Sequence, residues 1–583
     1  MSLAERLLRP GRSGPREVRL DILWLLGLSL LAIAAGLGLR DPWPADEPRF
    51  ALIARDMVAT GQWLIPQVGG EVYADKPPLF FWIVGCFLLL TGSLRVALLL
   101  PGMLAGLGVV ALTYDLARRL WDRTIGLVAG LALLATVQFV WQARQGQIDA
   151  TLCFFTTLSV YGLLRHLLLG PAWRWYFLAW AAAGLGVITK GVGFLPVLML
   201  LPYGLARARN WISPSADGSA SGRWKWRLGP VAMLGAISLW LAPMLIASSG
   251  DPVIARYRDE ILFGQTIHRY AGAWHHREPF WYFMVQVVPF LWLPLIALVP
   301  WLWKHWLASW RSRDMRVLLP LAWVMLVLVF FSLSSGKRGV YVLPAVPAFV
   351  LACAPFAPEL MRCRGPRNTL FGITCGLMLA VFGAAMYLLV DEARRQQVAT
   401  AYDIDVVGPL SAIALAGAGM CVLARPRRAF AAYAGVLLAT LLIVSYWVNP
   451  VMNDARSGAS FMRRVKDLAP RDKELGLVAY KEQYLLYLDR AIVNFGHARW
   501  REYEQEAADA AAWLAADPQG RVLLVDERAR QLCFSTASAR AVAVANRMQW
   551  SLVSGAPQAD CVARGRIEAA RVYSPPTLAE KAP

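Results

Sequence analysis

Charged residues are scarce in this chain. They make up 17% of its 583 residues, whereas hydrophobic residues make up 57%. A soluble protein of this length would form several domains, each with a polar surface that this composition cannot supply. The low charge therefore excludes a set of soluble domains and favours a protein that crosses a membrane many times. The 25 tryptophans agree with this interpretation, because the indole ring suits the boundary between lipid and water.

Several familiar binding patterns are also missing. The eight cysteines form no CxxC pair, so they do not outline a zinc or redox site. The polar C-terminal part has no glycine-rich nucleotide fingerprint, and the chain has no internal repeat or low-complexity segment. Two cysteines, Cys533 and Cys561, lie in that polar part, where they are free to pair in an oxidising compartment.

Acidic residues are outnumbered by basic ones. The chain has 39 Asp and Glu against 59 Lys and Arg, which gives a formal net charge of +20. A nucleic-acid-binding protein would gather this charge on one domain, but here the basic residues form short clusters between long apolar runs. The distribution excludes nucleic acid as a partner and points to membrane topology instead.

Thirteen apolar runs predict membrane spans. They lie at 21–39, 95–117, 124–141, 149–168, 174–189, 191–207, 228–248, 281–303, 316–333, 338–356, 369–390, 407–424 and 429–447. The first run follows a basic N-terminus and has no small-residue cleavage site followed by a soluble domain. We therefore interpret it as an uncleaved first helix.

The loops between these runs differ in charge from one side to the other. Loops on the side of the N-terminus are short and rich in Arg or Lys, as cytoplasmic loops are. They are 117–123, 165–174, 207–227, 304–316, 362–367 and 425–428. The opposite loops are mixed or contain acids, and they are 40–94, 142–148, 249–280, 334–338 and 391–406. This predicts a cytoplasmic N-terminus, and an odd number of spans places residues 450–583 in the periplasm of a Gram-negative cell.

Residues 450–583 have the composition of a small globular domain. Their pattern predicts strands at 475–480, 521–526 and 541–545, and a helix at 502–516. The predicted fold class is thus an all-α polytopic membrane protein with about 13 transmembrane helices in residues 1–449. A small C-terminal α/β periplasmic domain follows it.

The outer loop 40–94 carries the clearest chemical signal. Asp46 and Glu47 are adjacent carboxylates just after the first span, and Arg49 follows them. One interpretation is structural, with Asp46 as the cap of a helix that begins at Pro48. The other is a functional site, because a cap needs only one carboxylate and a long loop with its own apolar periodicity is more often functional than idle. We favour the site, with the loop's helices lying flat at the membrane surface.

Asp149 is a second acidic candidate at the outer start of the fourth predicted span. The predicted topology places four basic residues with apolar surroundings on the same side as Asp46 and Asp149. They are Lys76, Lys190, Lys337 and Arg338. Charged groups at this depth usually face a cavity or a partner. An outer site with acids and several cations indicates an anionic substrate, most simply a phosphate.

Six short motifs occur in an order that resembles a known family. They are DEPRF at 46–50, WLIP at 63–66, YADKP at 73–77, TKG at 189–191, HREPFWY at 276–282 and KRGVYVLP at 337–344. Together they resemble the GT-C glycosyltransferases of the aminoarabinose transferase and protein mannosyltransferase superfamily. The bacterial lipid A aminoarabinose transferase-like branch is the closer resemblance, over residues 20 to 450.

The resemblance implies both the substrates and the roles of site residues. The sugar donor would be linked to a polyprenyl phosphate, usually undecaprenyl phosphate, and no nucleotide sugar would take part. Asp46 would be the principal catalytic carboxylate and Asp149 a second acid, with the adjacent Glu47 as a further catalytic candidate. The carrier phosphate would be held by four residues, which are Lys76, Arg49, Lys337 and Tyr341.

The resemblance also implies a possible divalent metal. In aminoarabinose transferases, which this chain resembles, a Glu and a His hold a zinc-like ion. This sequence has Asp75 and His276 at those two positions. Two protein ligands are fewer than zinc usually takes. The alternative for His276 is a wet residue at the membrane interface.

We therefore predict an inner-membrane hexosyl- or pentosyltransferase. Lipid A or another cell-envelope glycolipid is the expected acceptor, and a protein hydroxyl, as in protein O-mannosyltransferases, is the alternative. A lipid flippase or transporter is a more distant alternative, because the chain has no pseudo-symmetric halves. A structural scaffold would leave the 40–94 loop unexplained. Pro48 stands where Thr is common in true aminoarabinose transferases, so the sequence leaves the sugar open, as it does the oligomeric state.

Overall fold

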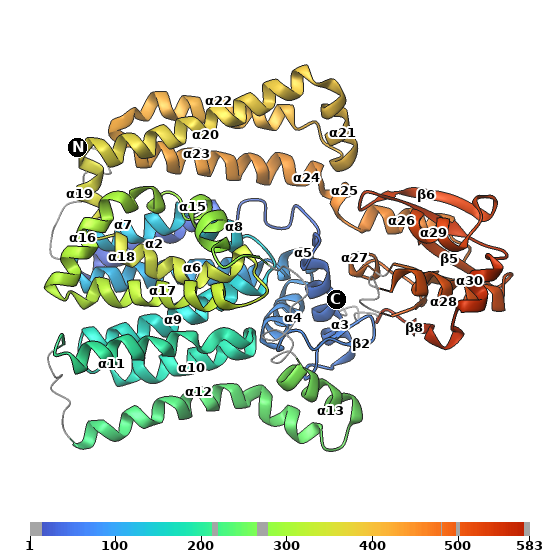
Figure 1. Ribbon diagram of the computed structural model, residues 1–583, viewed down its shortest axis with the longest axis horizontal. Coiled ribbons are helices and arrows are strands. Elements are labelled where there is room, and N and C mark those ends of the chain that lie inside the picture. Colours follow the sequence, from blue (N-terminus) through green and yellow to red (C-terminus); the bar gives the residue numbers. More distant parts are fainter. Residues whose placement is uncertain (1–13, 213–219, 265–277, 480, 497–501, 577–583) are drawn as a thin grey trace.

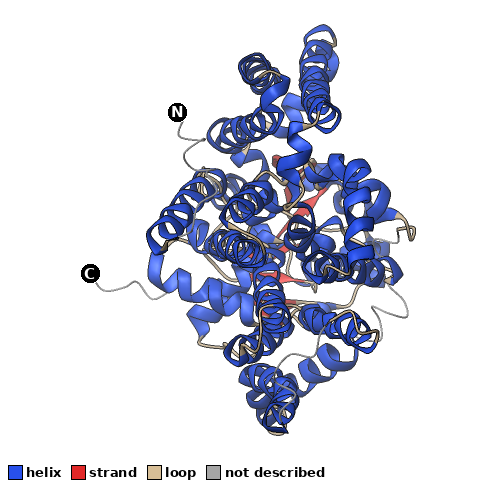
Figure 2. Ribbon diagram, turned by 90° about the vertical axis from the view of Figure 1, so that its left-hand side faces the viewer, coloured by secondary structure: helices blue, strands red, loops and turns tan. Residues whose placement is uncertain are grey.

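The molecule has a helical bundle and a smaller part that contains a sheet. The computed structural model describes residues 14–212, 220–264, 278–479, 481–496 and 502–576. Figure 1 shows the sheet beyond one end of the bundle, and Figure 2 shows the bundle helices from the other end. Between bundle and sheet lie the elements of the 40–94 loop. These are α3 (Glu47–Thr60), β1 (Gln67–Val68), β2 (Glu71–Val72), α4 (Leu79–Thr91) and α5 (Leu94–Ala97).

The bundle helices follow the predicted apolar runs. They are α2 (Pro15–Ile33), α6 (Leu100–Leu120), α7 (Arg123–Leu134), α8 (Val137–Ala143), α9 (Ile148–Leu168), α10 (Trp173–Thr189), η1 (Gly191–Met199), α11 (Leu200–Ala208), α12 (Ala220–Ala247), η3 (Phe283–Val287), α15 (Val288–Leu291), η4 (Leu295–Leu298), α16 (Val299–Ser312), α17 (Met315–Leu333), η5 (Gly339–Ala345), α18 (Val346–Cys353), α20 (Arg364–Val390), α22 (Val407–Ala424), α23 (Ala429–Ile443), η7 (Val444–Val448) and α24 (Asn449–Val451). Apolar side chains suit lipid, and a helix satisfies its own backbone there.

Within the described ranges, eight helices are long and apolar enough to cross a membrane, or up to ten if each bent pair is one span. Three predicted runs fall short of that test. The helix α2 has charged residues in its first turns, α10 has only 17 residues, and the apolar helix Gly339–Cys353 is shorter still. The chain is a multi-pass membrane protein, and the count of thirteen spans stays a prediction.

Two runs predicted as continuous helices are in fact bent. The pair α7 and α8 bends by 68°, and the pair Phe283–Leu291 and Leu295–Ser312 bends by 104°. The two breaks satisfy each other's polar groups. The Val137 amide donates to the Leu293 carbonyl (3.4 Å), and the Trp292 indole N–H donates to the Gln138 side chain (2.7 Å). Pro294, in the second break, has no amide to donate. Hydropathy could not predict these breaks, because the partners lie far apart in sequence.

The C-terminal part is built on one mixed sheet of six strands in the order β6-β7-β5-β3-β4-β8. The strands are β3 (Glu474–Leu477), β4 (Ile492–Asn494), β5 (Arg521–Asp526), β6 (Ala539–Ala545), β7 (Met548–Val553) and β8 (Arg571–Tyr573). The central β3 pairs in parallel with β4 and β5, while the outer pairings are antiparallel. The predicted strands correspond to β3, β5 and β6, and the predicted helix corresponds to α28 (Tyr503–Ala516). The other three strands were not predicted.

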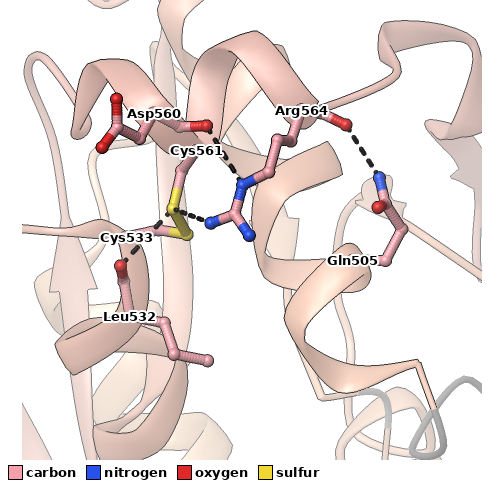
Figure 3. The surroundings of a disulfide bond; sticks show 6 residues. All are labelled: Gln505, Leu532, Cys533, Asp560, Cys561 and Arg564. Atoms are coloured by element: carbon pink, nitrogen blue, oxygen red, sulfur yellow. Dashed lines mark hydrogen bonds between the residues drawn. A yellow bond between two sulfur atoms is a disulfide. The ribbon is translucent and has the colours of Figure 1, made fainter.

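A disulfide joins two short helices beside this sheet. Cys533 of α29 (Glu527–Cys533) is bonded to Cys561 of α30 (Ala559–Arg564), across a separation of 28 residues (Figure 3). Both cysteines are buried, and the Arg564 guanidinium lies 3.7 Å from the Cys561 sulfur. The pairing that the sequence left open is therefore made in the structure.

The sheet and the 40–94 layer share one hydrophobic core. Phe50 and Phe81 belong to the same buried cluster as Tyr484 and Trp550 of the C-terminal part. Polar contacts reinforce this junction, since Arg55 donates to the Tyr573 hydroxyl (2.8 Å), which donates to Asp56 (2.8 Å). Burial raises the pKa of Asp56, although Arg55 opposes the shift. The C-terminal part is thus packed onto α3 rather than tethered by a linker.

A buried ion pair fixes the connection from α2 to α3. Glu47 is 4% exposed and accepts hydrogen bonds from the Arg40 guanidinium (2.7 Å), the Trp43 amide (3.0 Å) and the Gly146 amide (2.9 Å). A second Arg40 nitrogen also donates to Glu47. Glu47 therefore ties the start of α3 to the α8–α9 connection, and its contacts favour a structural role over the predicted catalytic one.

We predict that Cys533→Ser with Cys561→Ser loosens only the C-terminal part. The chain-entropy model gives a closed loop of this size about 3.5 kcal/mol of stabilisation. Protease should therefore cleave the 450–583 region of the purified protein several-fold faster. Cys86→Ser, at an exposed free cysteine, is the matched control. Equal cleavage rates in all three proteins would contradict the prediction.

We also predict that Glu47→Ala destabilises the bundle far more than Asp46→Ala. Removing Glu47 leaves Arg40 buried without a charge partner, which costs about 3–5 kcal/mol. The Asp46 carboxylate pairs with a partly exposed arginine instead, a contact worth about 1 kcal/mol or less. Thermal unfolding in detergent would measure both, and equal midpoints would show that Glu47 does not hold this connection.

Candidate active site

Asp46 lies at the N-terminus of α3 but does not cap it. Its side chain makes no capping hydrogen bond. Instead it accepts a hydrogen bond from Arg338 at 2.9 Å, and Arg49 lies 4.0 Å away. The structural alternative, a simple helix cap, is therefore not formed. The Asp46 carboxylate is held by two cations at the end of the bundle that faces the sheet.

Asp149 pairs with the other conspicuous cation of this region. Lys190, at the end of α10, lies 2.6 Å from Asp149 at the start of α9. Their side chains are only 9% and 13% exposed. The Lys190 ammonium also lies 4.5 Å from the ring centre of Tyr341 on η5, a cation–π contact that fixes both groups.

Arg338 links the two acidic residues. Burial lowers the pKa of Arg338, but Asp46 and, to a smaller extent, Asp149 and Tyr341 outweigh it, so the pKa is raised. These residues come from four separate segments of the chain. The structure thus places Asp46, Asp149, Lys190, Arg338 and Tyr341 in one cluster of alternating charge.

Arg49 connects this cluster to the C-terminal part. Its guanidinium lies 2.7 Å from Glu482 and 5.9 Å from the ring centre of Tyr73. Burial lowers the pKa of Arg49, but Glu482 and Tyr73 outweigh it and the pKa is raised. Burial also raises the pKa of Tyr73, and the charges of Asp75 and Asp46 add to this. Asp46, Arg49, Tyr73 and Asp75 are therefore electrostatic neighbours.

The other two predicted phosphate ligands have different surroundings. Lys337 is 5% exposed, and its ammonium donates to the carbonyls of Glu278 (2.8 Å) and Ser334 (2.7 Å). The Lys76 ammonium donates to the carbonyl of Asp75 (3.0 Å). Lys76 thus lies beside Asp75, one of the electrostatic neighbours of Tyr73. Lys337 instead joins the segment at Ser334 to the backbone of Glu278. Their role in holding a phosphate stays a prediction.

The structure describes only one of the two predicted metal ligands. Asp75 is exposed, and His276 lies outside the described residues. Among the residues with described positions, no three His, Cys, Asp or Glu side chains gather as metal ligands. Asp75 alone does not form the set of three or four that zinc requires.

Sequence reasoning did not find every member of the site. It placed Lys190 and Arg338 on the same side as Asp46 as part of a cationic group but gave neither an individual role, and it missed Glu482. No local signal could have found Glu482, because it lies 433 residues from Arg49 in a segment of ordinary polar composition.

Comparisons with known proteins agree with this arrangement. The family described as dolichyl-phosphate-mannose-protein mannosyltransferase matches residues 75–217. An undecaprenyl phosphate-alpha-4-amino-4-deoxy-L-arabinose arabinosyl transferase from Enterobacter sp. strain 638 is 29% identical, over 64% of this chain and 67% of its own length. One from Pseudomonas fluorescens is 30% identical, over 63% of this chain and 67% of its own length.

A solved structure shares most of the fold. The crystal structure of ArnT from Cupriavidus metallidurans bound to undecaprenyl phosphate matches with a TM-score of 0.72 and 23% identity, over 91% of this chain and 97% of that one. The fold of most of the chain is therefore a known architecture. The sequence relatives carry the assignment: the chain belongs to the undecaprenyl phosphate–aminoarabinose arabinosyl transferase family of GT-C glycosyltransferases and is a membrane glycosyltransferase.

Proposed function

We propose that this enzyme transfers a sugar from undecaprenyl phosphate to lipid A or another cell-envelope glycolipid. The relatives named above act, by their names, on an undecaprenyl phosphate-linked sugar, and ArnT was crystallised with undecaprenyl phosphate. The observation that carries the proposal is the Asp46–Arg338 pair beside the Asp149–Lys190 pair at one end of a membrane bundle. Only the class of sugar, a pentose or a hexose, is proposed.

The charges of the cluster suit this reaction. Transfer breaks the bond between the sugar and the phosphate oxygen and forms a bond from the sugar to an acceptor oxygen. The phosphate leaves with negative charge, which Arg338, Arg49 and Lys76 would stabilise. For a hydroxyl acceptor, Asp46 would take the proton, whereas a phosphate acceptor is already nucleophilic and needs only to be oriented. Asp149 and Lys190 would hold Tyr341 and Arg338 in position.

The proposed location is the periplasmic face of the inner membrane. The loops rich in Arg and Lys support a cytoplasmic N-terminus. That orientation puts the start of α3, the start of α9 and the sheet on the periplasmic side. An enzyme that uses a lipid-borne sugar needs no nucleotide there.

Asp46→Asn tests the proposed role directly. The variant keeps the shape of the side chain but loses its charge, so we expect sugar transfer to fall about 10²–10⁴-fold. Arg338→Gln should lower it about 10²–10³-fold. The assay is mass spectrometry of lipid A after incubation of reconstituted enzyme with an undecaprenyl phosphate-linked sugar. Asp405→Asn, in an exposed pair with Arg395, is the matched control.

The same assay separates the alternatives. Unchanged transfer by Asp46→Asn would overturn the proposed site. Sugar found on protein hydroxyls instead of lipid would assign the enzyme to the protein O-mannosyltransferase reaction. Lipid movement across vesicles that survives Asp46→Asn, with no sugar transfer by the wild type, would indicate a flippase.

A double-mutant cycle tests the second pair. Each of Asp149→Asn and Lys190→Met leaves one buried charge unpaired, while the double variant removes both. We expect the double variant to be more stable than the sum of the single effects predicts, by about 0.5–3 kcal/mol. Transfer should stay low in all three, because the residues act as a unit. Wild-type transfer by the double variant would show that the pair is structural only.

A further inference from the structure

A cavity of about 310 Å³ lies next to the catalytic segment. Its wall includes Ala45 and Glu47, which flank Asp46 in the chain, but it does not include Asp46 itself. The cavity is bounded by the end of α2, the start of α6, the end of α8 and the segment from α23 to α25 (Asn453–Arg456). The cluster described above does not use this space.

The polar side of the cavity has an excess of positive charge. Three arginines line it, Arg40, Arg144 and Arg456, and Glu47 is the carboxylate that faces them. Arg40 and Glu47 neutralise each other in the buried pair. Both Glu47 oxygens are already occupied, so two positive charges remain without a partner in the lining.

These two arginines make no ion pair within the part of the chain that the structure describes. Arg144 donates only to neutral oxygens, the carbonyls of Ala32 and Ala35 (3.0 Å for the latter) and the Ser445 hydroxyl. Arg456 lies with its guanidinium 4.7 Å from the ring centre of Trp43. Both are half-buried. Burial and the neighbouring Arg40 lower the pKa of Arg144 to about 10. An anion in the cavity would offset the repulsion between Arg144 and Arg40.

The rest of the cavity wall is apolar. Leu37 follows α2, Met103 lies on α6, and Leu441, Val444 and Val448 lie on α23 and η7. These apolar residues thus come from several helices of the bundle. A small soluble anion would use the arginines and leave the apolar wall bare, whereas a lipid phosphate would use both.

The wall is built to a fixed shape. Gly36 has a positive φ of 74°, and a Cβ there would lie 2.9 Å from the Ser445 side chain. Arg144 bonds to that same serine and to the carbonyls just before Gly36. The end of α2 is therefore held against η7, which keeps the arginines and the apolar wall in register.

We propose that this cavity binds the phosphate group of a lipid, with the lipid's hydrocarbon lying along α2, α6 and α23. Arg144 and Arg456 hold the phosphate, while Arg40 stays paired with Glu47. The inference rests on the proposed function, which supplies the two candidate lipids: a phosphorylated acceptor and the carrier phosphate. In either case the phosphate would lie in a cavity whose wall includes both chain neighbours of Asp46.

Arg456→Gln tests this, because the substitution changes only the side chain and keeps the hydrogen bond from the Arg456 amide to the Met452 carbonyl (3.2 Å). Binding is measured by native mass spectrometry of the full chain carrying Asp46→Asn, so that no turnover intervenes. Four lipids are compared: phosphorylated lipid A, dephosphorylated lipid A, undecaprenyl phosphate and undecaprenol. Arg395→Gln, an exposed arginine on α21 (Glu392–Tyr402), is the matched control.

We expect Arg456→Gln to weaken binding of one phosphorylated lipid about tenfold or more, the effect of losing a charge-assisted hydrogen bond. Binding of its phosphate-free form should be unchanged. Loss confined to lipid A assigns the cavity to the acceptor, and loss confined to undecaprenyl phosphate assigns it to the carrier.

Unchanged binding of all four lipids, or an equal loss with and without phosphate, would overturn the proposal. Arg144→Gln provides a second variant, and it is scored only if its unfolding temperature matches that of the wild type. Failure of the cavity assignment can be distinguished from failure of the proposed function. If the wild type transfers no sugar but Arg456→Gln binds phosphorylated lipid less tightly, the cavity assignment stands while the proposed reaction falls.

Discussion

The ion pair between Arg40 and Glu47 fixes the segment on which the site depends. A charge buried near a membrane boundary must be paired, and Glu47 satisfies this with two guanidinium and two amide contacts. The adjacent Asp46 is then placed at the start of α3 without having to cap it. Two neighbouring carboxylates thus have separate tasks, since one holds the backbone and the other faces Arg338.

The same rule of paired charge organises the rest of the bundle end that faces the sheet. Asp149 pairs with Lys190, Asp46 with Arg338, and Arg49 with Glu482. These pairs are partly buried, so each side chain is held in place before a substrate arrives. An anionic substrate can enter such a network by replacing a carboxylate as the partner of a cation. In the proposed function, a phosphate that binds Arg49 would replace Glu482 as its partner.

The C-terminal part contributes to the site and does not merely follow it. Its Glu482 contacts Arg49, and its Tyr573 joins Arg55 and Asp56 on α3. The shared core of Phe50, Phe81 and Trp550 makes the sheet a support for the helix that carries Asp46. A change in the sheet, which contributes Trp550 of β7 and Tyr573 of β8 to this junction, would therefore alter the packing of α3.

Much of the molecule could be predicted from sequence because the relevant physics is local. Apolar runs determined that the chain crosses a membrane many times, and adjacent acids after the first run identified the neighbourhood of Asp46. Alternating patterns in residues 450–583 located β3, β5, β6 and α28. Hydropathy, charge and strand alternation depend on neighbours in the chain, so they can be read without coordinates.

Tertiary structure alone decided which residues meet. The bends after α7 and α15 depend on contacts between the two breaks, and hydropathy treats each as a continuous run. The different partners of Asp46 and Glu47 could not be inferred from their adjacent positions. The contact of Glu482 with Arg49 and the arginines around the cavity join segments that lie hundreds of residues apart. Composition determined that this protein lies in a membrane and favours an anionic ligand. The packing of helices hundreds of residues apart decided where the charges converge, because a charge pair depends on distance in space and not on separation in sequence.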